Sequence, residues 1–246
     1  MESIINITLS KYNLIFSILK FEIMKEMKTK DAENAEKAYL KTIEKYKELA
    51  EKSPETYFPK IAATQNNLGI LYWKLGRYGE AEFAYHEALK IGKELAKKNP
   101  EAYKPVVALT QNNFGLLYAD LGRYEETEHA YKEALEIYKE LADKNPDTYK
   151  SNVSMMQYNL GILYWKLGRF EEAEYAYLEA LEIDKELAKK NPDEYKFNVA
   201  MTQTSLGRLY NDLGRYEEAE RAYQEAIKIK EELANKIPDE RKIYKG

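Results

Sequence analysis

The sequence predicts an all-α fold, a right-handed superhelical solenoid of helix-turn-helix repeats with a period of 46 residues. Three sets of residues predict this fold, because each set recurs at that spacing over most of the chain. One set is a glycine after a large apolar residue, another is a glycine before arginine, and the third is a proline. The sets are Gly69, Gly115, Gly161 and Gly207; Gly76, Gly122, Gly168 and Gly214; and Pro54, Pro100, Pro146, Pro192 and Pro238.

The first helix of each unit is expected to begin near Pro59, Pro105, Ser151 or Phe197. Proline suits a first helical position because the N–H that it lacks would have no partner there. The helix should end at the leucine before each Gly-Arg pair, since that glycine can take the left-handed conformation that closes a helix. These starts divide the chain into predicted segments 1–58, 59–104, 105–150, 151–196 and 197–246.

The second helix of each unit is predicted to begin near Tyr78 and its equivalents. Glutamates occupy its first turns and lysines its last turns, an order that suits the helix dipole. Small and large apolar residues recur at helical spacing, as at Ala81, Tyr85 and Ala88. We therefore expect this helix to interlock with the first one through these positions.

The residues Leu68-Gly69-x2-Tyr72, followed by Gly76-x-Tyr78-x2-Ala81-x3-Tyr85-x2-Ala88, resemble the tetratricopeptide repeat pattern. The match recurs four times over roughly residues 59–230. Two features depart from the pattern: glutamine replaces the usual tryptophan, and the proline expected to end the second helix is replaced by Lys93, Lys139, Lys185 or Glu231. Each unit is therefore twelve residues longer than the common 34 and should have extended helices. The chain is similar in this to the long-repeat subclass seen in kinesin light chains, whose units also carry paired asparagines before the leucine.

The N-terminal part fits the same period. Residues 31–53 are predicted to be the second helix of an earlier unit, and residues 12–29 would hold its first helix without the usual signature. Three interpretations of the latter stay open: a degenerate helix or cap, an over-long start with initiation at Met24 or Met27, and a membrane or partner contact. Charges interrupt the apolar run 4–24, and no signal cleavage site follows it, so we expect no membrane span and a cytoplasmic protein.

Composition argues against several function classes. The chain has no cysteine and only two histidines, His86 and His129, both read as exterior residues, which leaves little material for metal or nucleophile chemistry. With 38 basic and 42 acidic residues, the net charge of −4 offers no basic footprint for nucleic acid. We therefore expect no enzyme activity, no metal and no cofactor.

The resemblance implies that the first helices line a concave groove that binds a protein or peptide partner. Eight groove positions are candidates for partner binding: Asn66, Asn67, Trp73, Asn112, Asn113, Tyr158, Asn159 and Trp165. A carboxamide can both donate to and accept from a peptide backbone, and a tryptophan can anchor it.

Two alternatives to partner binding stay open. The asparagines could pair with neighbouring helices while the tryptophans pack between units, so that both serve only the fold. The chain could also be a structural module that self-assembles by stacking or exchanging repeat ends, giving a homo-oligomer.

Overall fold

The computed structural model describes residues 30–236, which form nine α-helices and no β-strand. Every helix is 21 residues long. Their bounds are α2 Lys30–Ala50, α3 Pro54–Lys74, α4 Tyr78–Lys98, α5 Pro100–Asp120, α6 Tyr124–Lys144, α7 Pro146–Lys166, α8 Phe170–Lys190, α9 Pro192–Asp212 and α10 Tyr216–Lys236.

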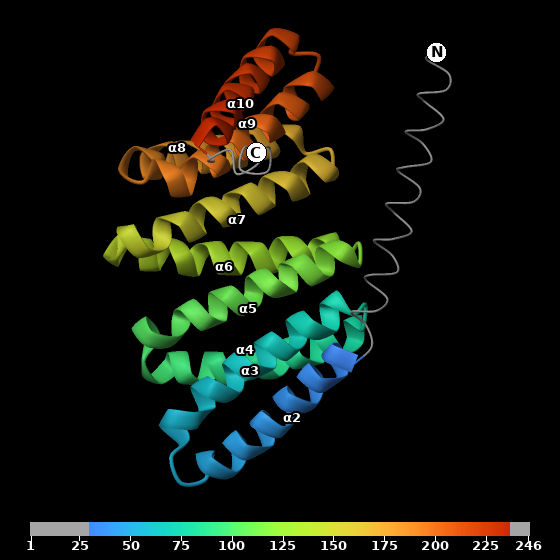
Figure 1. Cartoon of the computed structure of the whole chain (residues 1–246), viewed down its shortest axis with the longest axis vertical. Helices are drawn as coiled ribbons and strands as arrows, with labels where there is room; N and C mark the ends of the chain where they lie inside the picture. The colour runs from blue at the N-terminus through green and yellow to red at the C-terminus, as the bar shows by residue number, and fades with distance from the viewer. Residues whose placement is uncertain (1–29, 237–246) are drawn as a thin grey trace, which may run out of the picture. The chain divides into compact units, whose positions relative to one another are not determined.

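The helices form two compact units, one ending at Lys98 and the other beginning at Asn99. In the described part of the first unit, α3 packs against both α2 and α4. In the second unit, each helix from α5 to α10 packs against the next one in the chain. Figure 1 shows this within each unit: the helices run back and forth, and neighbours in sequence are neighbours in space. The predicted all-α helix-turn-helix repeat is confirmed.

The first helices begin five residues before the predicted starts, at Pro54, Pro100, Pro146 and Pro192. The expectation of Pro59 was wrong because Pro59 lies inside α3, where it removes only one hydrogen bond close to the helix start. In α5 the residue before the N-terminal proline caps the helix: the Asn99 side chain accepts a hydrogen bond from the Ala102 N–H at 3.2 Å. The predicted boundaries at 59, 105, 151 and 197 therefore fall inside helices.

The turn between the two helices of a unit is closed by glycine, as predicted. Gly76 has a φ of +72°, and its N–H donates to the Trp73 carbonyl at 2.9 Å while the Arg77 N–H donates to the Tyr72 carbonyl at 2.9 Å. This pair of bonds is the Schellman arrangement, and it needs the left-handed conformation that glycine adopts without strain. The other positive-φ residues of the described chain are the equivalents Gly122, Gly168 and Gly214.

The two helices of a unit interlock through a glycine and a tyrosine. A Cβ built on Gly161 would lie 2.6 Å from the ring of Tyr177, which is 2% exposed. The same contact joins Gly207 to Tyr223 at 2.7 Å. Small buried residues such as Ala173 and Ala180 complete the contact from the second helix. The predicted packing of small against large residues is confirmed.

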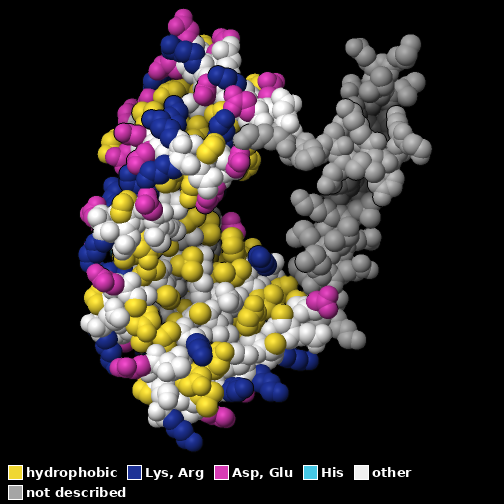
Figure 2. All heavy atoms as spheres, turned by 60° about the vertical axis from the view of Figure 1, so that its left-hand side comes forward, with side chains coloured by type: hydrophobic (Ala, Val, Ile, Leu, Met, Phe, Trp, Pro, Cys, Tyr) yellow, Lys and Arg dark blue, Asp and Glu magenta, His cyan; other side chains and the backbone are white. Residues whose placement is uncertain are grey.

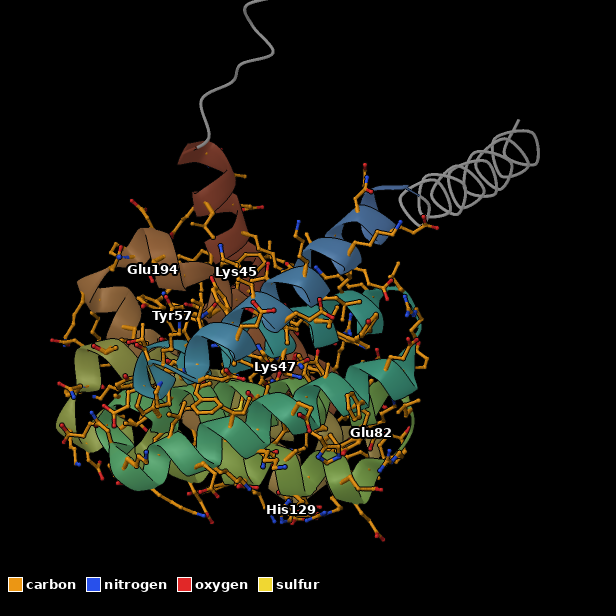
Figure 3. All side chains as sticks on the ribbon, turned by 90° about the horizontal axis from the view of Figure 1, so that it is seen from below. Lys45, Lys47, Tyr57, Glu82, His129 and Glu194 are labelled. Carbon is orange, nitrogen blue, oxygen red and sulfur yellow. The ribbon has the colours of Figure 1, made fainter. Side chains whose placement is uncertain are left out.

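A helix lies where residues 31–53 were expected to form one, because α2 spans Lys30–Ala50 and packs against α3. The first helix proposed at 12–29 lies outside the described residues, so the degenerate first unit stays a prediction. Both histidines are exposed, as predicted, and Figure 3 shows His129 pointing away from the helices.

Candidate partner-binding face

Polar side chains join the first helices of the second unit directly to one another. Asn159 of α7 donates its Nδ2 to Oδ1 of Asn112 on α5 at 3.2 Å. On the other flank of α7, the hydroxyl of Tyr158 lies 3.2 Å from that of Ser205 on α9. Adjacent residues on a helix point about 100° apart. The Tyr158 side chain therefore contacts α9, the next first helix, and the Asn159 side chain contacts α5, the preceding one.

The tryptophan of α7 makes a similar contact. The Trp165 indole N–H donates to the Asp212 carboxylate on α9 at 2.7 Å. The three bonded pairs are 47 residues apart, one more than the repeat period, because each bond joins opposite flanks of equivalent helices. These bonds tie α5, α7 and α9 together, and they use the groups that were expected to face a partner.

Burial separates the eight predicted residues into two groups. Asn66, Asn112 and Asn113 are only 5%, 6% and 7% exposed, so the protein itself covers most of their surface. Asn67 is exposed, and the remaining four residues are half-buried: Trp73, Tyr158, Asn159 and Trp165. The accessible part of the predicted set in the second unit therefore lies on α7.

Exposed apolar side chains lie between these polar ones. Met155 and Ile162 are each 39% exposed, although both sit on a helix whose opposite side is buried. Together with three predicted residues they form a row at spacings of three and four, which places them on one side of the helix. We call this row the α7 stripe; its members are Met155, Tyr158, Asn159, Ile162 and Trp165.

Sequence reasoning missed Met155. The helix spacing alone could have found it, since Met155 is four residues before Asn159, whereas its neighbour Met156 points the other way and is fully buried. Leu109, the equivalent residue of α5, is also exposed, at 44%. An apolar side chain is thus exposed at this position in two consecutive first helices.

A pocket of about 290 Å³ opens beside the α7 stripe, between α7 and α9. Asp184 of α8 is one of its lining residues and is 2% exposed. Burial raises the pKa of the Asp184 carboxyl to about 6, although hydrogen bonds from Ser154, Asn198 and Thr202 act to lower it. The Ser154 hydroxyl donates to Asp184 Oδ1 at 2.7 Å.

Asp184 is a second residue that sequence reasoning missed. It lies in the segment EALEIDKELAKKNP, whose copies look nearly interchangeable. The signal was its position within that segment, where the other units carry Gly92, Tyr138 and Lys230. A position that changes from glycine to tyrosine, aspartate and lysine among near-copies is a candidate for a role specific to one unit.

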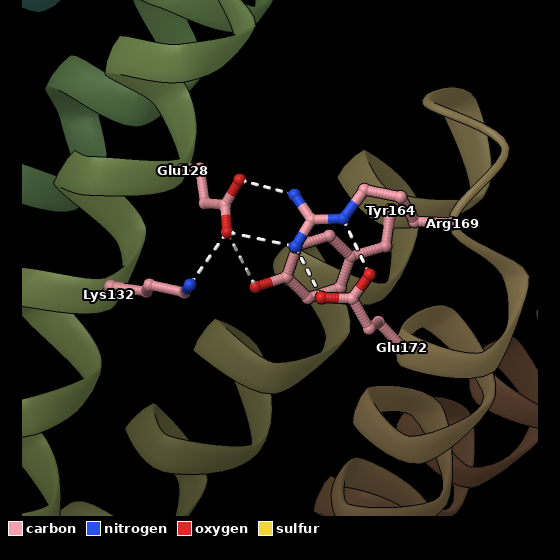
Figure 4. Close-up of polar contacts among 5 residues, drawn as sticks. All are labelled: Glu128, Lys132, Tyr164, Arg169 and Glu172. Carbon is pink, nitrogen blue, oxygen red and sulfur yellow. Dashed lines mark hydrogen bonds and ion pairs between the residues drawn. The ribbon is translucent and has the colours of Figure 1, made fainter.

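Charged clusters on the second helices have a different role. Glu128 of α6 accepts hydrogen bonds from Arg169 at 2.6 Å and from Tyr164 at 3.2 Å, and it pairs with Lys132 at 2.7 Å (Figure 4). Arg169 also binds Glu172 and lies over the Tyr164 ring, 4.3 Å from its centroid. Burial acts to raise the pKa of Glu128, but Arg169 and Lys132 outweigh it and lower the pKa to about 2.

The same cluster recurs at Glu36, Tyr72 and Arg77 in the first unit, and at Glu174, Tyr210 and Arg215 in the second. In each case the arginine follows the turn glycine and reaches the second helix of the preceding repeat. The clusters therefore hold successive repeats together, and their carboxylates are already occupied by protein groups.

Other kinds of site lack support in the described residues. Between residues 30 and 236, no group of three or more potential ligands could hold a metal ion. None of the helices in this range is long and apolar enough to cross a bilayer. On the face drawn in Figure 2, the positive side chains of the described residues are mixed with negative ones rather than gathered in a basic block.

Solved structures share the fold at low sequence identity. BtubC (BKLC) from P. vanneervenii is 21% identical, with a TM-score of 0.61, and the match covers 85% of this chain and 95% of that one. RapI in its apo form is 20% identical with a TM-score of 0.60, covering 78% of this chain and 49% of its own. A variant of a putative kinesin light chain from Podosopora anserina, with nearly identical TPR-like repeats, is 17% identical with a TM-score of 0.54, covering 88% and 97%.

Sequence comparison identifies the family. Among proteins with curated functions, none matches this chain. Residues 60–140, 106–186 and 199–239 each match the tetratricopeptide repeat, and these matches cover more than half of the chain. They coincide with the helix pairs closed by Gly-Arg turns and interlocked by glycine and tyrosine. The chain belongs to the tetratricopeptide repeat family.

Proposed function

We propose that this protein is a non-catalytic cytoplasmic scaffold that binds a segment of a partner protein along the first helices. Proteins of this family generally mediate protein–protein interaction or self-assembly. The observation that carries the proposal is the α7 stripe, where exposed Met155 and Ile162 alternate with half-buried polar and aromatic side chains. Repeat proteins use such surfaces for binding because the side chains of successive first helices form one continuous face.

The α7 stripe has the two components that a peptide-binding surface needs. Met155, Ile162 and the Trp165 ring supply apolar area, and truncating a tryptophan anchor commonly costs about 2 kcal/mol or more of binding energy. Asn159 and Tyr158 supply groups that both donate and accept, each worth about 1 kcal/mol per net hydrogen bond. In this proposal the exposed Asn67 and the half-buried Trp73 are partner contacts of the first unit by itself, while the buried Asn66, Asn112 and Asn113 support the helices on which they lie.

The proposal is tested by replacing an apolar member of the stripe. A photoreactive amino acid at position 162, with the protein in a lysate of its native source, should form a covalent adduct with a partner that mass spectrometry identifies. Ile162→Ser combined with Trp165→Ala should then weaken binding of that purified partner by about 100-fold, since two contacts of roughly 1–2 kcal/mol each are lost. Titration calorimetry with the purified partner measures this.

Leu178 is the matched control because it is also an exposed apolar residue, at 44%, but lies on the second helix α8. Leu178→Ser should bind the partner as the wild type does, and a photoreactive group at 178 should give no adduct. Equal affinities for the stripe variant, the control variant and the wild type would reject partner binding on α7.

A second candidate function, self-assembly, is favoured by one residue of α10. Ile227 is 55% exposed, whereas Leu135 and Leu181, the equivalent residues of α6 and α8, are 9% and 7% exposed. Each of those two helices packs against the first helix that follows it in the chain. Ile227 could thus receive the first helix of a second copy.

Light scattering over a concentration series tests self-assembly, with Ile227→Glu as the variant. If copies stack through α10, the mass of the wild-type protein rises with concentration and the variant stays monomeric. A wild-type protein that is monomeric throughout the series would reject this function and leave partner binding unaffected.

A further inference from the structure

We propose that the pocket between α7 and α9 receives a lysine side chain of the partner segment, with its ammonium group bound to Asp184. This inference rests on the proposed function, because the pocket shares Met155 and Tyr158 with the α7 stripe. A segment lying along the stripe would pass the pocket mouth, so one of its side chains could enter.

The size and lining of the pocket suit one long side chain. Its volume of about 290 Å³ lies just below the range for small-molecule sites, about 300–1,000 Å³. Met155, Tyr158 and Met201 provide apolar and aromatic walls, while Ser151, Asn152 and Asn198 provide polar groups. A lysine stem of four methylene groups packs against apolar walls while its ammonium seeks polar partners.

The charge of the pocket calls for a cation. Asp184 is almost fully buried, and the hydrogen bonds that act on its carboxylate come from Ser154, Asn198 and Thr202, all of them neutral. A buried carboxylate without a countercharge is costly, and an ammonium group entering the pocket would supply that charge. The raised pKa of the Asp184 carboxyl agrees with this reading, because burial is its largest cause.

Packing alone does not require a carboxylate at this position. The equivalent Tyr138 of α6 is 3% exposed, so an uncharged residue fills the same place in the preceding unit. Asp184 instead combines with Ser154 and with the polar residues of α9 that line the pocket. The polar set is particular to this unit, as Ala108 stands at the position equivalent to Ser154.

The geometry favours lysine over arginine. Hydrogen bonds from Ser154, Asn198 and Thr202 already occupy most of the acceptor sites of the Asp184 carboxylate, whereas a guanidinium fork needs two of these sites at once. An ammonium group is a compact point charge that can bind one remaining site together with nearby hydroxyl or carboxamide oxygens. We therefore expect N-acetyl-lysinamide to bind more tightly than N-acetyl-argininamide.

The test observes the pocket directly by NMR of methionine methyl groups. N-acetyl-lysinamide should shift the Met155 and Met201 methyl signals with millimolar affinity and leave buried Met156 unchanged, whereas the neutral isostere N-acetyl-norleucinamide should cause no shift. Asp184→Asn should weaken the lysine probe at least 10-fold while circular dichroism and the Met156 signal stay as in the wild type. Leu178→Ser serves as the matched control and should bind the probe normally.

A pH series on the wild-type protein gives the same test without a substitution. Affinity for the lysine probe should fall as pH drops from 7 to 5, because Asp184, with a pKa near 6, becomes protonated. The titratable group that faces it from α9 is Tyr195, whose own pKa is raised by a hydrogen bond with Glu194, so it stays protonated throughout. From α7 the facing group is the neutral hydroxyl of Ser154.

The outcomes separate this inference from the proposed function. If Ile162→Ser loses partner binding but the lysine probe shifts no methionine signal, lysine binding at Asp184 is rejected and partner binding on the α7 stripe is retained. The lysine probe could also shift the methionine signals in an Asp184-dependent way while the stripe variant still binds the partner normally. That result would reject partner binding on the α7 stripe, and with it the partner as the source of the lysine. Cadaverine binding at least 10-fold more tightly than N-acetyl-lysinamide would identify a free diamine as the ligand and overturn the partner's lysine.

Discussion

Asp184 shows how one residue can set binding and stability against each other. Burial raises the pKa of its carboxyl to about 6 in the folded protein, from 3.8 for an unperturbed aspartate. A raised acid pKa means that the folded state holds the proton more tightly than the unfolded state does. The ionised group therefore destabilises the fold above pH 6, and this cost disappears as pH falls towards 3.8.

Asp184→Asn should accordingly raise the free energy of unfolding at pH 7. The pKa difference corresponds to about 3 kcal/mol at most, and we expect a gain of about 1–3 kcal/mol because the asparagine keeps the size and can accept from Ser154. Urea denaturation at pH 7 and pH 4 measures this. The advantage over the wild type should shrink at pH 4, and an equal advantage at both pH values would contradict the raised pKa.

At Gly161 the neighbouring Tyr177 ring leaves no room for a larger side chain. Gly161→Ala should destabilise the protein by about 1–3 kcal/mol, because the added Cβ would lie 2.6 Å from the Tyr177 ring. Gly79→Ala is the control: this helical glycine has open space around it, so alanine should stabilise by up to about 1 kcal/mol. Thermal unfolding of both variants measures the pair, and a neutral Gly161→Ala would contradict the close contact.

At the scale of elements, the arginine clusters join each turn to the helix before it. Glu128 has a lowered pKa of about 2, so the stability it contributes is complete above pH 4.5 and is lost as pH falls from 4.5 towards 2. The pKa values of other carboxylates in these clusters are also lowered, among them those of Glu36 and Glu172. Acid should therefore loosen the junctions between repeats before it affects the apolar contacts within them.

Glu128→Gln tests this. At pH 7 it should lower the free energy of unfolding by about 1–3 kcal/mol, because Arg169 and Lys132 lose their shared carboxylate. At pH 3 the difference from the wild type should be smaller. Glu136→Gln on the same helix is exposed and should change stability by no more than about 0.5 kcal/mol. Chemical denaturation at both pH values decides, and a difference that does not narrow in acid would contradict the lowered pKa of Glu128.

Some elements could be predicted from the sequence and others could not, for physical reasons. The turns at Gly76 and its equivalents were predictable because the residue that closes the helix has a positive φ, which glycine adopts without strain. The starts of α3 and α5 were not, because each has two prolines that fit a first turn, Pro54 and Pro59 in α3, and the sequence does not say which begins the helix. In both helices the first residue is the proline that directly follows the serine or asparagine at the N-cap position.

The candidate site divides in the same way. The first helices could be predicted from the sequence. Tyr158, Asn159 and Trp165 are half-buried on α7, and their contact with a partner stays a prediction. The hydrogen bond between Asn159 and Asn112 could not be predicted, because it depends on how α5 and α7 are rotated against each other. The role of Asp184 could not be predicted for a related reason: residues of three helices, α7, α8 and α9, line its pocket.

At the scale of the whole molecule, each repeat of the second unit contacts chiefly the next one, so the free energy of local unfolding should differ from repeat to repeat. Gly207→Ala would place a Cβ 2.7 Å from the ring of Tyr223 and weaken the α9–α10 pair. Hydrogen exchange followed by mass spectrometry should then speed up in α9 and α10 while α5 and α6 keep their wild-type rates. Faster exchange spread evenly over all helices would show instead that the chain unfolds as one cooperative block.

The bonds between first helices have a consequence for how such a chain can grow. Asn112 with Asn159, and Tyr158 with Ser205, are pairs in which either side chain can give or take the hydrogen. A copied 46-residue unit inserted among these helices would find a compatible neighbour on both flanks without any compensating substitution. Lengthening by duplication therefore needs no new kind of contact between first helices, and a copied unit can differ from its neighbours at a few inward positions, as this unit does at Ser154 and Asp184.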